Sequence, residues 1–406
     1  MDAAASEALA TESPTDAPEP SPSPSPFPSP TPSPTPSPSP TPQGRFVHPG
    51  VVTTTAQLDY VRRQVAVGRQ PWAEAYRVLQ RSEYGSLSWS PSPRDVVECG
   101  AYSNPDLGCT DEWRDATAAN AHVLLWVISG DERHARKAAE IIDAWSAVLR
   151  DHTGANAQLQ AAKAASSFVR AAELLRHTDA GWPAESVARA ESMFRDVMLP
   201  RIVEGGPARP NGNWDLIAVN AMMAIAVFLD DETLFDTAVQ RWRVRLPAFI
   251  YHSADGPNPV PPPNGYGNLG QIGYWHGQRT YVDGLTQETC RDLEHTGWGL
   301  AAMSQAAETA WIQGVDLWFE AQARLVAALE LHAGFSLGDP VPGWLCGGSL
   351  KSRLDPIPEL AYNHYANRVG LPLPRTAQLV EAGRPQPARH FYGWDTLTST
   401  PLASPH

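Results

Sequence analysis

Apolar residues recur every three or four positions along most of the chain after about residue 55, which is the spacing of amphipathic helices. In the segment 131–150, Ala135, Ile142 and Trp145 fall on one side of such a helix, and Asp131 stands where an N-cap residue belongs. Alternating runs typical of strands are scarce. The pattern predicts helices at approximately residues 55–67, 71–82, 112–129, 131–150, 156–177, 184–204, 214–229, 231–248, 285–312, 315–333 and 356–369.

Short polar turns, such as Asp230-Asp231, separate several of these helices. Connections this short make the flanking helices antiparallel neighbours. Successive helical hairpins over about 300 residues predict an all-α fold, specifically an α/α toroid that forms an incomplete α/α barrel. An α-solenoid is the alternative, but no self-similarity at a fixed period of about 34 to 45 residues is visible.

The first part of the chain has a different composition. Residues 1–12 are small and acidic, and fourteen prolines lie between Pro14 and Pro42, mostly alternating with Ser or Thr. Proline fixes φ and removes a backbone donor, so this tract predicts an extended linker without a packed core. We therefore expect a disordered acidic and Ser/Thr-Pro-rich linker at residues 1–42 and a folded α/α domain at residues 43–406.

Charge and length exclude several classes of protein. The chain carries 31 Lys and Arg against 44 Asp and Glu, a net charge of −13, without a basic cluster, which argues against nucleic acid as a partner. No apolar run approaches the roughly 20 residues of a membrane span. Neither a phosphate-binding glycine loop nor an HExxH, CxxC or GxSxG motif is present. A polyanionic ligand would need a locally positive patch, for which Arg279, Arg291 and Arg368 are available.

Cysteine usage points to two different situations. Cys99 and Cys109 close a Pro-, Gly- and Ser-containing stretch, and in an exported protein they would pair as a disulfide. Cys290 and Cys346 are ambiguous, because buried free cysteine is also common.

One long segment, Ser253–Thr286, breaks the helical pattern. It is rich in Gly and Pro and contains Tyr266, Tyr274 and Tyr281. A loop of this length inside a compact domain is usually functional.

The densest candidate chemistry lies in the predicted helix that begins at residue 285. Glu288, Arg291 and His295 are spaced at i, i+3 and i+7, so they share one face of that helix. On an ordinary amphipathic helix such a face is solvated. Here the next turn contributes Trp298 and small residues, which favours enclosure by protein. On an inner helix of a toroid, Arg291 and His295 would point into a central cleft.

Two further polar positions stand near helix ends. The segment Asn211-Gly212-Asn213 precedes an apolar helix, and spacing alone makes Asn213 an N-cap, although an amide there can also bind an anionic carboxylate. His252 follows a predicted helix just before the long loop, where a histidine often only compensates the helix dipole.

The segment 359–368 has a dense polar and aromatic composition that includes His364, Tyr365 and Arg368. A role in a binding site and ordinary amphipathic packing are both compatible with this pattern.

A hydrolytic or metal-dependent site is less clearly indicated. Carboxylates for a pair about 5 to 10 Å apart are available, but no spacing singles out two of them. Asp292 and His295 have metal-ligand spacing without an evident third ligand. The available carboxylates are Asp215, Glu288, Asp292, Glu294 and Glu308.

Several stretches together resemble the alginate-lyase-like superfamily of polysaccharide lyases, over about residues 46–375. The resemblance implies an α/α toroid that cleaves uronic-acid polysaccharides by β-elimination without a nucleotide cofactor. The stretches are Asp115-Ala-Thr-Ala-Ala-Asn-Ala-His-Val-Leu-Leu-Trp126 with Gly130-Asp131, Ala171-Ala-Glu173-Leu-Leu, Asn211-Gly-Asn213-Trp214, Asp283-Gly-Leu-Thr-Gln-Glu-Thr-Cys-Arg291-Asp-Leu-Glu-His295-Thr and Tyr362-Asn-His364-Tyr365.

In the family pattern, an Asn at a helix start and an Arg neutralise the substrate carboxylate, which makes the neighbouring C5 proton removable. Carried over, these residues are Asn213 and Arg291. A His or Tyr then takes the proton, and a Tyr or His protonates the leaving oxygen. Some relatives place a His directly after the Asn, where this chain has Trp214. Others place a Tyr one or two turns after the Arg, where this chain has His295 and Trp298.

We therefore expect His295 in acid-base catalysis, with His252 as a second histidine and a loop tyrosine, Tyr281 before Tyr274 or Tyr266, and Tyr365 in reserve. The predicted catalytic residues are Asn213, His252, Tyr281, Arg291 and His295, and the predicted substrate-binding residues are Trp214, Gln287, Glu288, His364, Tyr365 and Arg368. No metal or cofactor is expected.

Two other functions stay open at this point. One is an α/α-barrel glycoside hydrolase that uses paired carboxylates, and the other is a non-catalytic carbohydrate-binding protein with aromatic stacking platforms. In each case the partner is a polysaccharide, acidic for the lyase. We expect a secreted monomer, although no signal peptide is visible in the sequence.

Overall fold

The structure is a computed structural model that describes residues 45–205 and 212–399. The predicted linker at residues 1–42 lies outside the described residues, so the proposed domain division stays a prediction. The α-helices are α1 (Thr55–Ala66), α2 (Trp72–Arg81), α3 (Cys109–Ser129), α4 (Glu132–Val148), α5 (Ala157–Arg176), α6 (Ala184–Ser192), α7 (Leu199–Gly205), α8 (Gly212–Phe228), α9 (Glu232–Phe249), α10 (Gly270–Tyr274), α11 (Leu293–Ile312), α12 (Leu317–Leu337), α13 (Glu359–Tyr362), α14 (Pro374–Gly383) and α15 (Asp395–Thr398).

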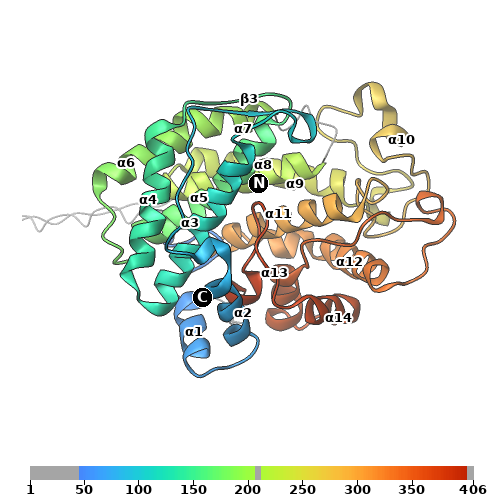
Figure 1. The fold of residues 1–406 in the computed structure, drawn as a ribbon. Helices are drawn as coiled ribbons and strands as arrows, with labels where there is room; N and C mark the ends of the chain where they lie inside the picture. The colour runs from blue at the N-terminus through green and yellow to red at the C-terminus, as the bar shows by residue number, and fades with distance from the viewer. Residues whose placement is uncertain (1–44, 206–211, 400–406) are drawn as a thin grey trace, which may run out of the picture. The chain divides into compact units, whose positions relative to one another are not determined.

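Helices α3, α5, α8 and α11 form a row in which each contacts the next (Figure 1). Buried polar side chains join them at matching heights. Gln160 on α5 donates to Glu112 on α3 at 2.8 Å, and Asn220 on α8 donates to Ser166 on α5 at 3.2 Å and to Gln305 on α11 at 2.9 Å. These pairings show that the four helices run parallel, as inner helices of an α/α toroid do.

The remaining helices lie outside this row or close it. Helix α4 packs on α3, α9 on α8, and α12 on α11, while α15 near the C-terminus contacts α1, α2 and α13. The predicted α/α toroid is confirmed.

The inner helices are buried on nearly every side, which their sequences explain. In α8 all residues from Leu216 to Phe228 are buried, and they are apolar except Asn220. Alanines along α5, such as Ala161, Ala164 and Ala171, let its neighbours approach closely. An all-round apolar helix belongs inside a larger helical layer, so these segments occupy the centre of the fold.

A small sheet in the order β2-β1-β3 lies beside the N-terminal ends of α3 and α5. Its strands are β1 (Val96–Cys99), β2 (Asp106–Leu107) and β3 (Asp151–Thr153). Strand β1 pairs antiparallel with β2, with Glu98 opposite Leu107, and parallel with β3, with Val97 opposite His152. The predicted disulfide between Cys99 and Cys109 is present and joins β1 to the start of α3.

Most helix boundaries match the sequence pattern. The short helices α10 and α15 were not predicted, and π-helical turns at Met193–Met198 and Asn363–Arg368 interrupt the helices predicted at 184–204 and 356–369. Two further differences concern α11 and α14. The predicted helix 285–312 begins only at Leu293, because Asp292 accepts a hydrogen bond from the backbone N–H of His295 at 2.8 Å and caps α11 there. Helix α14 was missed, since Pro374 at its first position reads as a helix breaker but is favourable at a helix start.

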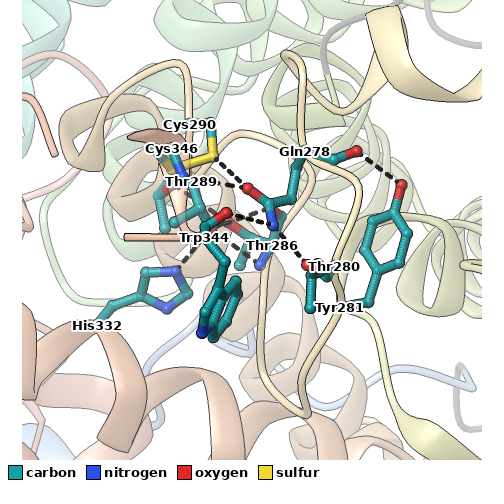
Figure 2. The surroundings of a disulfide bond; sticks show 10 residues. Gln278, Thr280, Tyr281, Thr286, Thr289, Cys290, His332, Trp344 and Cys346 are labelled. Atoms are coloured by element: carbon teal, nitrogen blue, oxygen red, sulfur yellow. Dashed lines mark hydrogen bonds between the residues drawn. A yellow bond between two sulfur atoms is a disulfide. The ribbon is translucent and has the colours of Figure 1, made fainter. Parts of the chain in front are cut away.

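The loop between α9 and α11 has an apolar cluster of its own. Tyr251, Tyr274, Trp275 and Leu285 are buried there together with Leu345 from the loop after α12. A second disulfide, Cys290–Cys346, ties the turn before α11 to the loop after α12 (Figure 2). The aromatic side chains of this loop thus hold the loop together, and the disulfide fixes the turn that carries Arg291.

None of the helices within residues 45–205 and 212–399 is long and apolar enough to cross a membrane.

Candidate active site

The candidate site forms where the N-terminal ends of the inner helices lie together. Asn213 is in the first turn of α8 and His295 in the first turn of α11, while Lys163 is in the second turn of α5. Parallel inner helices bring these turns to one end of the toroid. The macrodipoles of these helices make that end favourable for anions.

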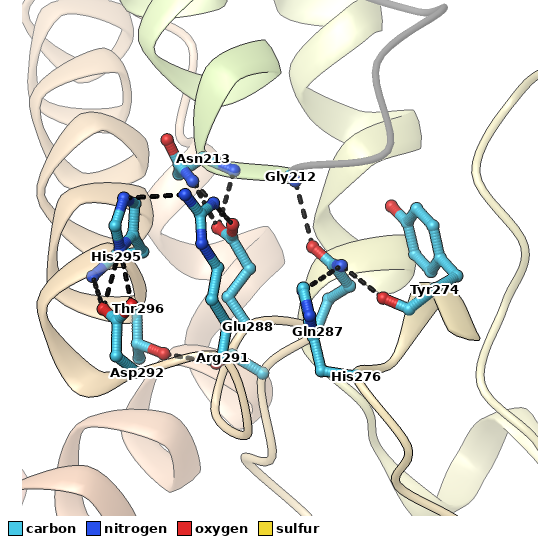
Figure 3. Close-up of polar contacts among 11 residues, drawn as sticks. Gly212, Asn213, Tyr274, His276, Gln287, Glu288, Arg291, Asp292, His295 and Thr296 are labelled. Atoms are coloured by element: carbon cyan, nitrogen blue, oxygen red, sulfur yellow. Dashed lines mark hydrogen bonds and ion pairs between the residues drawn. The ribbon is translucent and has the colours of Figure 1, made fainter. Parts of the chain in front are cut away.

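Asn213 is fully buried and is held by the carboxylate of Glu288 (Figure 3). Its side-chain Nδ2 donates to Glu288 Oε1 at 2.6 Å and to Oε2 at 2.7 Å, and its backbone N–H donates to Oε2 at 3.0 Å. The prediction of an N-cap from spacing is therefore wrong. Asn213 is the second residue of α8, and its side chain binds Glu288 instead of a backbone N–H of the helix. Its Oδ1 has no hydrogen-bond partner among residues 45–205 and 212–399, so within this part of the chain one buried acceptor is left for another group.

Arg291 lies between Glu288 and His295. Its Nη1 donates to Glu288 Oε1 at 2.7 Å, and its Nη2 lies 2.8 Å from Nε2 of His295. Glu288 is fully buried, whereas about a quarter of the Arg291 side chain is exposed. A buried carboxylate thus fixes a guanidinium that still reaches the surface. The three residues meet as predicted, although Glu288 and Arg291 lie on a turn and not on the helix itself.

Asp292 orients His295 from the other side of the ring. Nδ1 of His295 lies 2.8 Å from both carboxylate oxygens of Asp292. Burial would raise the pKa of Asp292, but the hydrogen bonds from His295 and the charge of Arg291 lower it. Because Asp292 is anionic, Nδ1 carries the proton, and Nε2 is the basic nitrogen that faces Arg291. This arrangement can remove a proton from a group placed next to the guanidinium.

Gln287 connects this cluster to the long loop. Its Oε1 accepts from the backbone N–H of Gly212 at 3.0 Å, and its Nε2 donates to the carbonyl of Tyr274 and lies 3.4 Å from Nε2 of His276. Burial is the largest effect on the pKa of His276 and lowers it, while the charge of Glu288 raises it and that of Arg291 lowers it. His276 has φ of 51°. Residues held in such a conformation are common at functional sites.

His276 lies in the loop that the sequence marks as functional, but it is not among the predicted site residues. No local pattern distinguishes it from the other loop aromatics, since its position depends on the fold of the loop. Trp214, predicted to bind substrate, is half-buried directly after Asn213. Gln287 and Glu288, predicted to bind substrate, are buried beneath the site and position Gly212, Asn213 and Arg291.

Two of the predicted catalytic residues lie apart from this cluster. His252 caps a short 3-10 turn, accepting from Ala254 N–H at 3.1 Å, and its Nε2 lies 3.9 Å from Asp283. The hydroxyl of Tyr281 donates to the carbonyl of Gln278 at 3.0 Å. Neither side chain hydrogen-bonds a residue of the cluster within the described chain, so the structure does not bring them to Arg291 and His295.

The segment 359–368 packs at the other end of α11. Arg368 forms two 2.8 Å hydrogen bonds with buried Glu308, Tyr365 donates to the carbonyl of Trp318 at 2.8 Å, and His364 stacks on the same tryptophan at 4.6 Å. Glu308 is thirteen residues after His295 on one helix, which is about 20 Å at 1.5 Å per residue. The prediction that His364, Tyr365 and Arg368 bind substrate is corrected, because they are core residues far from the cluster.

The candidate carboxylates for hydrolysis are each committed to a basic partner. Asp215 is bound by Arg245 at 2.7 Å and also pairs with Arg241, and Glu308 is bound by Arg368. Asp215, Glu288 and Glu308 are also buried. The acid of a glycosidase must reach the glycosidic oxygen, and these three carboxylates are enclosed and bound by their basic partners.

One group away from the site has metal-ligating atoms in proximity. Such atoms of His48, Glu173 and His177 lie within 4.8 Å of one another. The two imidazoles are stacked at 4.2 Å with an interplanar angle of 13°. Lone pairs in parallel ring planes do not converge on one ion, so the geometry describes a hydrogen-bonded cluster.

Comparison with known proteins gives a consistent result. Residues 88–259 match the family model described as alginate lyase. The alginate lyase structure from Bacteroides ovatus superposes with a TM-score of 0.59 at 14% identity, covering 87% of this chain and 100% of that one. Alginate lyase A1-III from Sphingomonas species A1 gives 0.52 at 14% identity, covering 80% and 92%. A variant of A1-III in complex with a tetrasaccharide gives 0.55 at 14% identity, covering 82% and 92%. No curated protein sequence matches the chain.

At this level of identity, the structural matches show a shared fold, and the family model adds a sequence match over α3 to α9. Together with the site, they indicate a polysaccharide lyase. Within that class the chain resembles the alginate-lyase-like superfamily, which confirms the resemblance seen in the sequence.

Proposed function

We propose that this lyase cleaves a uronic-acid polysaccharide, of the alginate or glucuronan type, by β-elimination. The observation that carries the proposal is the arrangement of Arg291 and His295. A guanidinium and the basic nitrogen of an oriented imidazole lie 2.8 Å apart. Elimination next to a carboxylate needs a cation that binds the carboxylate and a base close to it.

In the proposed complex, the uronate carboxylate binds Arg291. The guanidinium has five N–H donors, of which Glu288 and His295 occupy one each. The bound carboxylate loses most of its repulsion toward a second negative charge, so the enolate that forms at C5 is stabilised. Asn213 supports this site through Glu288, and its unpartnered Oδ1 accepts a hydrogen bond from a sugar hydroxyl.

The elimination itself needs only one acid-base residue. When the substrate carboxylate binds the guanidinium, the hydrogen bond from Arg291 to Nε2 of His295 opens. Nε2 then takes the proton from C5, the C5–H electrons form the C4–C5 double bond, and the bond from C4 to the glycosidic oxygen breaks. The imidazolium that forms is stabilised by Asp292, as in hydrolase triads. It then returns the proton to the leaving oxygen, so protons and charge balance.

The roles of His252 and Tyr281 as acid or base lose support, because both are engaged elsewhere in the loop. His276 is the better second candidate, since it lies beside Gln287 and burial keeps its imidazole neutral.

Alginate is the first substrate to test, because the three solved structures are described as alginate lyases. We also propose that the protein is secreted. Its two disulfides account for all four cysteines, and disulfides persist in oxidising compartments.

The test is incubation with alginate and with glucuronan, followed by ultraviolet absorption of the unsaturated uronate ends. Elimination creates this absorbance, and hydrolysis does not. Reducing ends without absorbance would establish a hydrolase, and binding without either product would establish a carbohydrate-binding protein. Either outcome refutes the proposal.

A further inference from the structure

Lys163 is an unusual residue at the same end of the toroid. It is one of three lysines in the chain and lies in the second turn of α5. Its exposed fraction is 8%, and no described residue hydrogen-bonds its ammonium group. Its Nζ lies 4.0 Å from the centre of the Trp298 ring.

A buried ammonium without a hydrogen-bonded anion is unfavourable in a folded protein. Burial lowers the pKa of Lys163 to about 7, so the folded protein itself disfavours the charge. Two other buried cations have anionic partners, since Arg245 binds Asp215 and Arg368 binds Glu308. Buried Arg170 is like Lys163, because burial lowers its pKa as well. Packing alone does not explain a lysine here, because an apolar side chain would fill the position without this cost.

One anion, Glu294, acts on Lys163 and raises its pKa, but burial and the charge of Arg389 lower it by more. Glu294 on α11 is nearby, but its carboxylate binds Arg389 at 3.1 Å. Arg389 itself lowers the pKa of Lys163. His390 packs on Trp298 at 5.1 Å, and burial and Lys163 lower the pKa of that imidazole to about 2. Arg389 also pairs with Asp355 at 3.2 Å, so Lys163 shares Glu294 with a second cation.

Trp298 connects this group to the catalytic candidates, because its ring also lies 5.0 Å from the ring of His295. The Trp298 ring thus contacts both His295 and Lys163, so the ammonium of Lys163 lies one side chain away from the proposed base.

We propose that Lys163, with Trp298 beneath it, forms a second carboxylate-binding subsite, which binds the uronate next to the one held by Arg291. The inference rests on the proposed function and specifies its substrate: at least two adjacent sugars must be acidic. It also gives the buried ammonium a hydrogen-bonded anion, which it lacks in the free protein.

The test is Lys163→Met, which keeps the length of the side chain and removes the charge. On an acidic polymer, KM should rise about tenfold, as expected for one lost charge-assisted hydrogen bond, while kcat changes less than twofold. The melting temperature should stay constant or rise, because an unpaired buried charge is removed. Lys137→Met on outer helix α4 is the matched control and should leave KM unchanged.

Two results would overturn the subsite. An unchanged KM in Lys163→Met shows that the ammonium does not bind substrate, and a large fall in kcat at constant KM shows that it acts in proton transfer instead. If the native protein produces no unsaturated ends, the proposed function fails separately. Calorimetric binding of an alginate oligosaccharide to the native protein and to Lys163→Met then still decides the subsite, which is rejected if the two affinities agree.

Discussion

Nη2 of Arg291 lies 2.8 Å from Nε2 of His295, so the group that neutralises a carboxylate and the group that accepts a proton touch each other in the free protein. A guanidinium only donates hydrogen bonds, so this contact requires an unprotonated Nε2. The resting site thus already holds His295 in the form that a general base needs.

Replacing either member of this pair should abolish elimination. For Arg291→Ala and His295→Gln, we expect kcat/KM to fall at least about a thousandfold, because carboxylate neutralisation or proton transfer is lost. Absorbance of unsaturated uronate ends measures the loss, and helical circular dichroism should be unchanged. Near-normal turnover in either variant would remove that residue from the mechanism.

Asp292→Asn isolates the orientation of the imidazole. Asn also serves well as an N-cap, so α11 should begin normally and stability should change little. Its amide cannot stabilise the imidazolium and favours the wrong tautomer of His295, so kcat should fall by about two to four orders of magnitude.

A matched variant separates this effect from helix capping. Asp316→Asn changes the N-cap of α12, where Asp316 accepts from Phe319 N–H at 2.9 Å. It should retain full activity. Equal losses in the two variants would show that capping, and not His295, is responsible.

The disulfide Cys290–Cys346 should matter for activity as well as stability, because Cys290 directly precedes Arg291. Replacing both cysteines by Ser removes a crosslink over 56 residues. From the chain entropy of the unfolded state, a crosslink of this length contributes about 4 kcal/mol to the free energy of unfolding. We expect a lower melting temperature and, well below it, a several-fold lower kcat/KM because the turn of Arg291 loosens.

Replacing Cys99 and Cys109 by Ser is the control, since that disulfide spans only ten residues and stabilises by about 3 kcal/mol. It should lower stability with little effect on kcat/KM at low temperature. If both double variants keep full activity, the anchoring role of Cys290 is excluded.

The helices and the toroid were predictable because apolar periodicity and short turns are local signals. Arg291 and His295 were also found locally, since a spacing of four residues brings them together even though α11 starts between them. The contact between Asn213 and Glu288 joins residues 75 positions apart and depends on how α8 packs against the turn. For the same reason the sequence could not show that Glu288 is buried, or that His364 and Arg368 face the far end of α11.

The N-terminal segment should give the fold a pH-dependent stability. His48 lies 2.7 Å from Glu173 and 3.1 Å from Asp230. Burial alone would lower the pKa of His48, but these two carboxylates raise it above the ordinary 6.5. A raised pKa in the folded state stabilises the protein below the unfolded value and loses that effect as the pH rises through the folded value.

His48→Gln should therefore cost about 1 kcal/mol near pH 6, and the difference from the native protein should shrink steadily toward pH 9. Chemical denaturation of both proteins across this range measures it. A difference that does not change with pH would show that His48 stabilises the segment by neutral hydrogen bonds, and one that grows with pH would reverse the assignment of its charge.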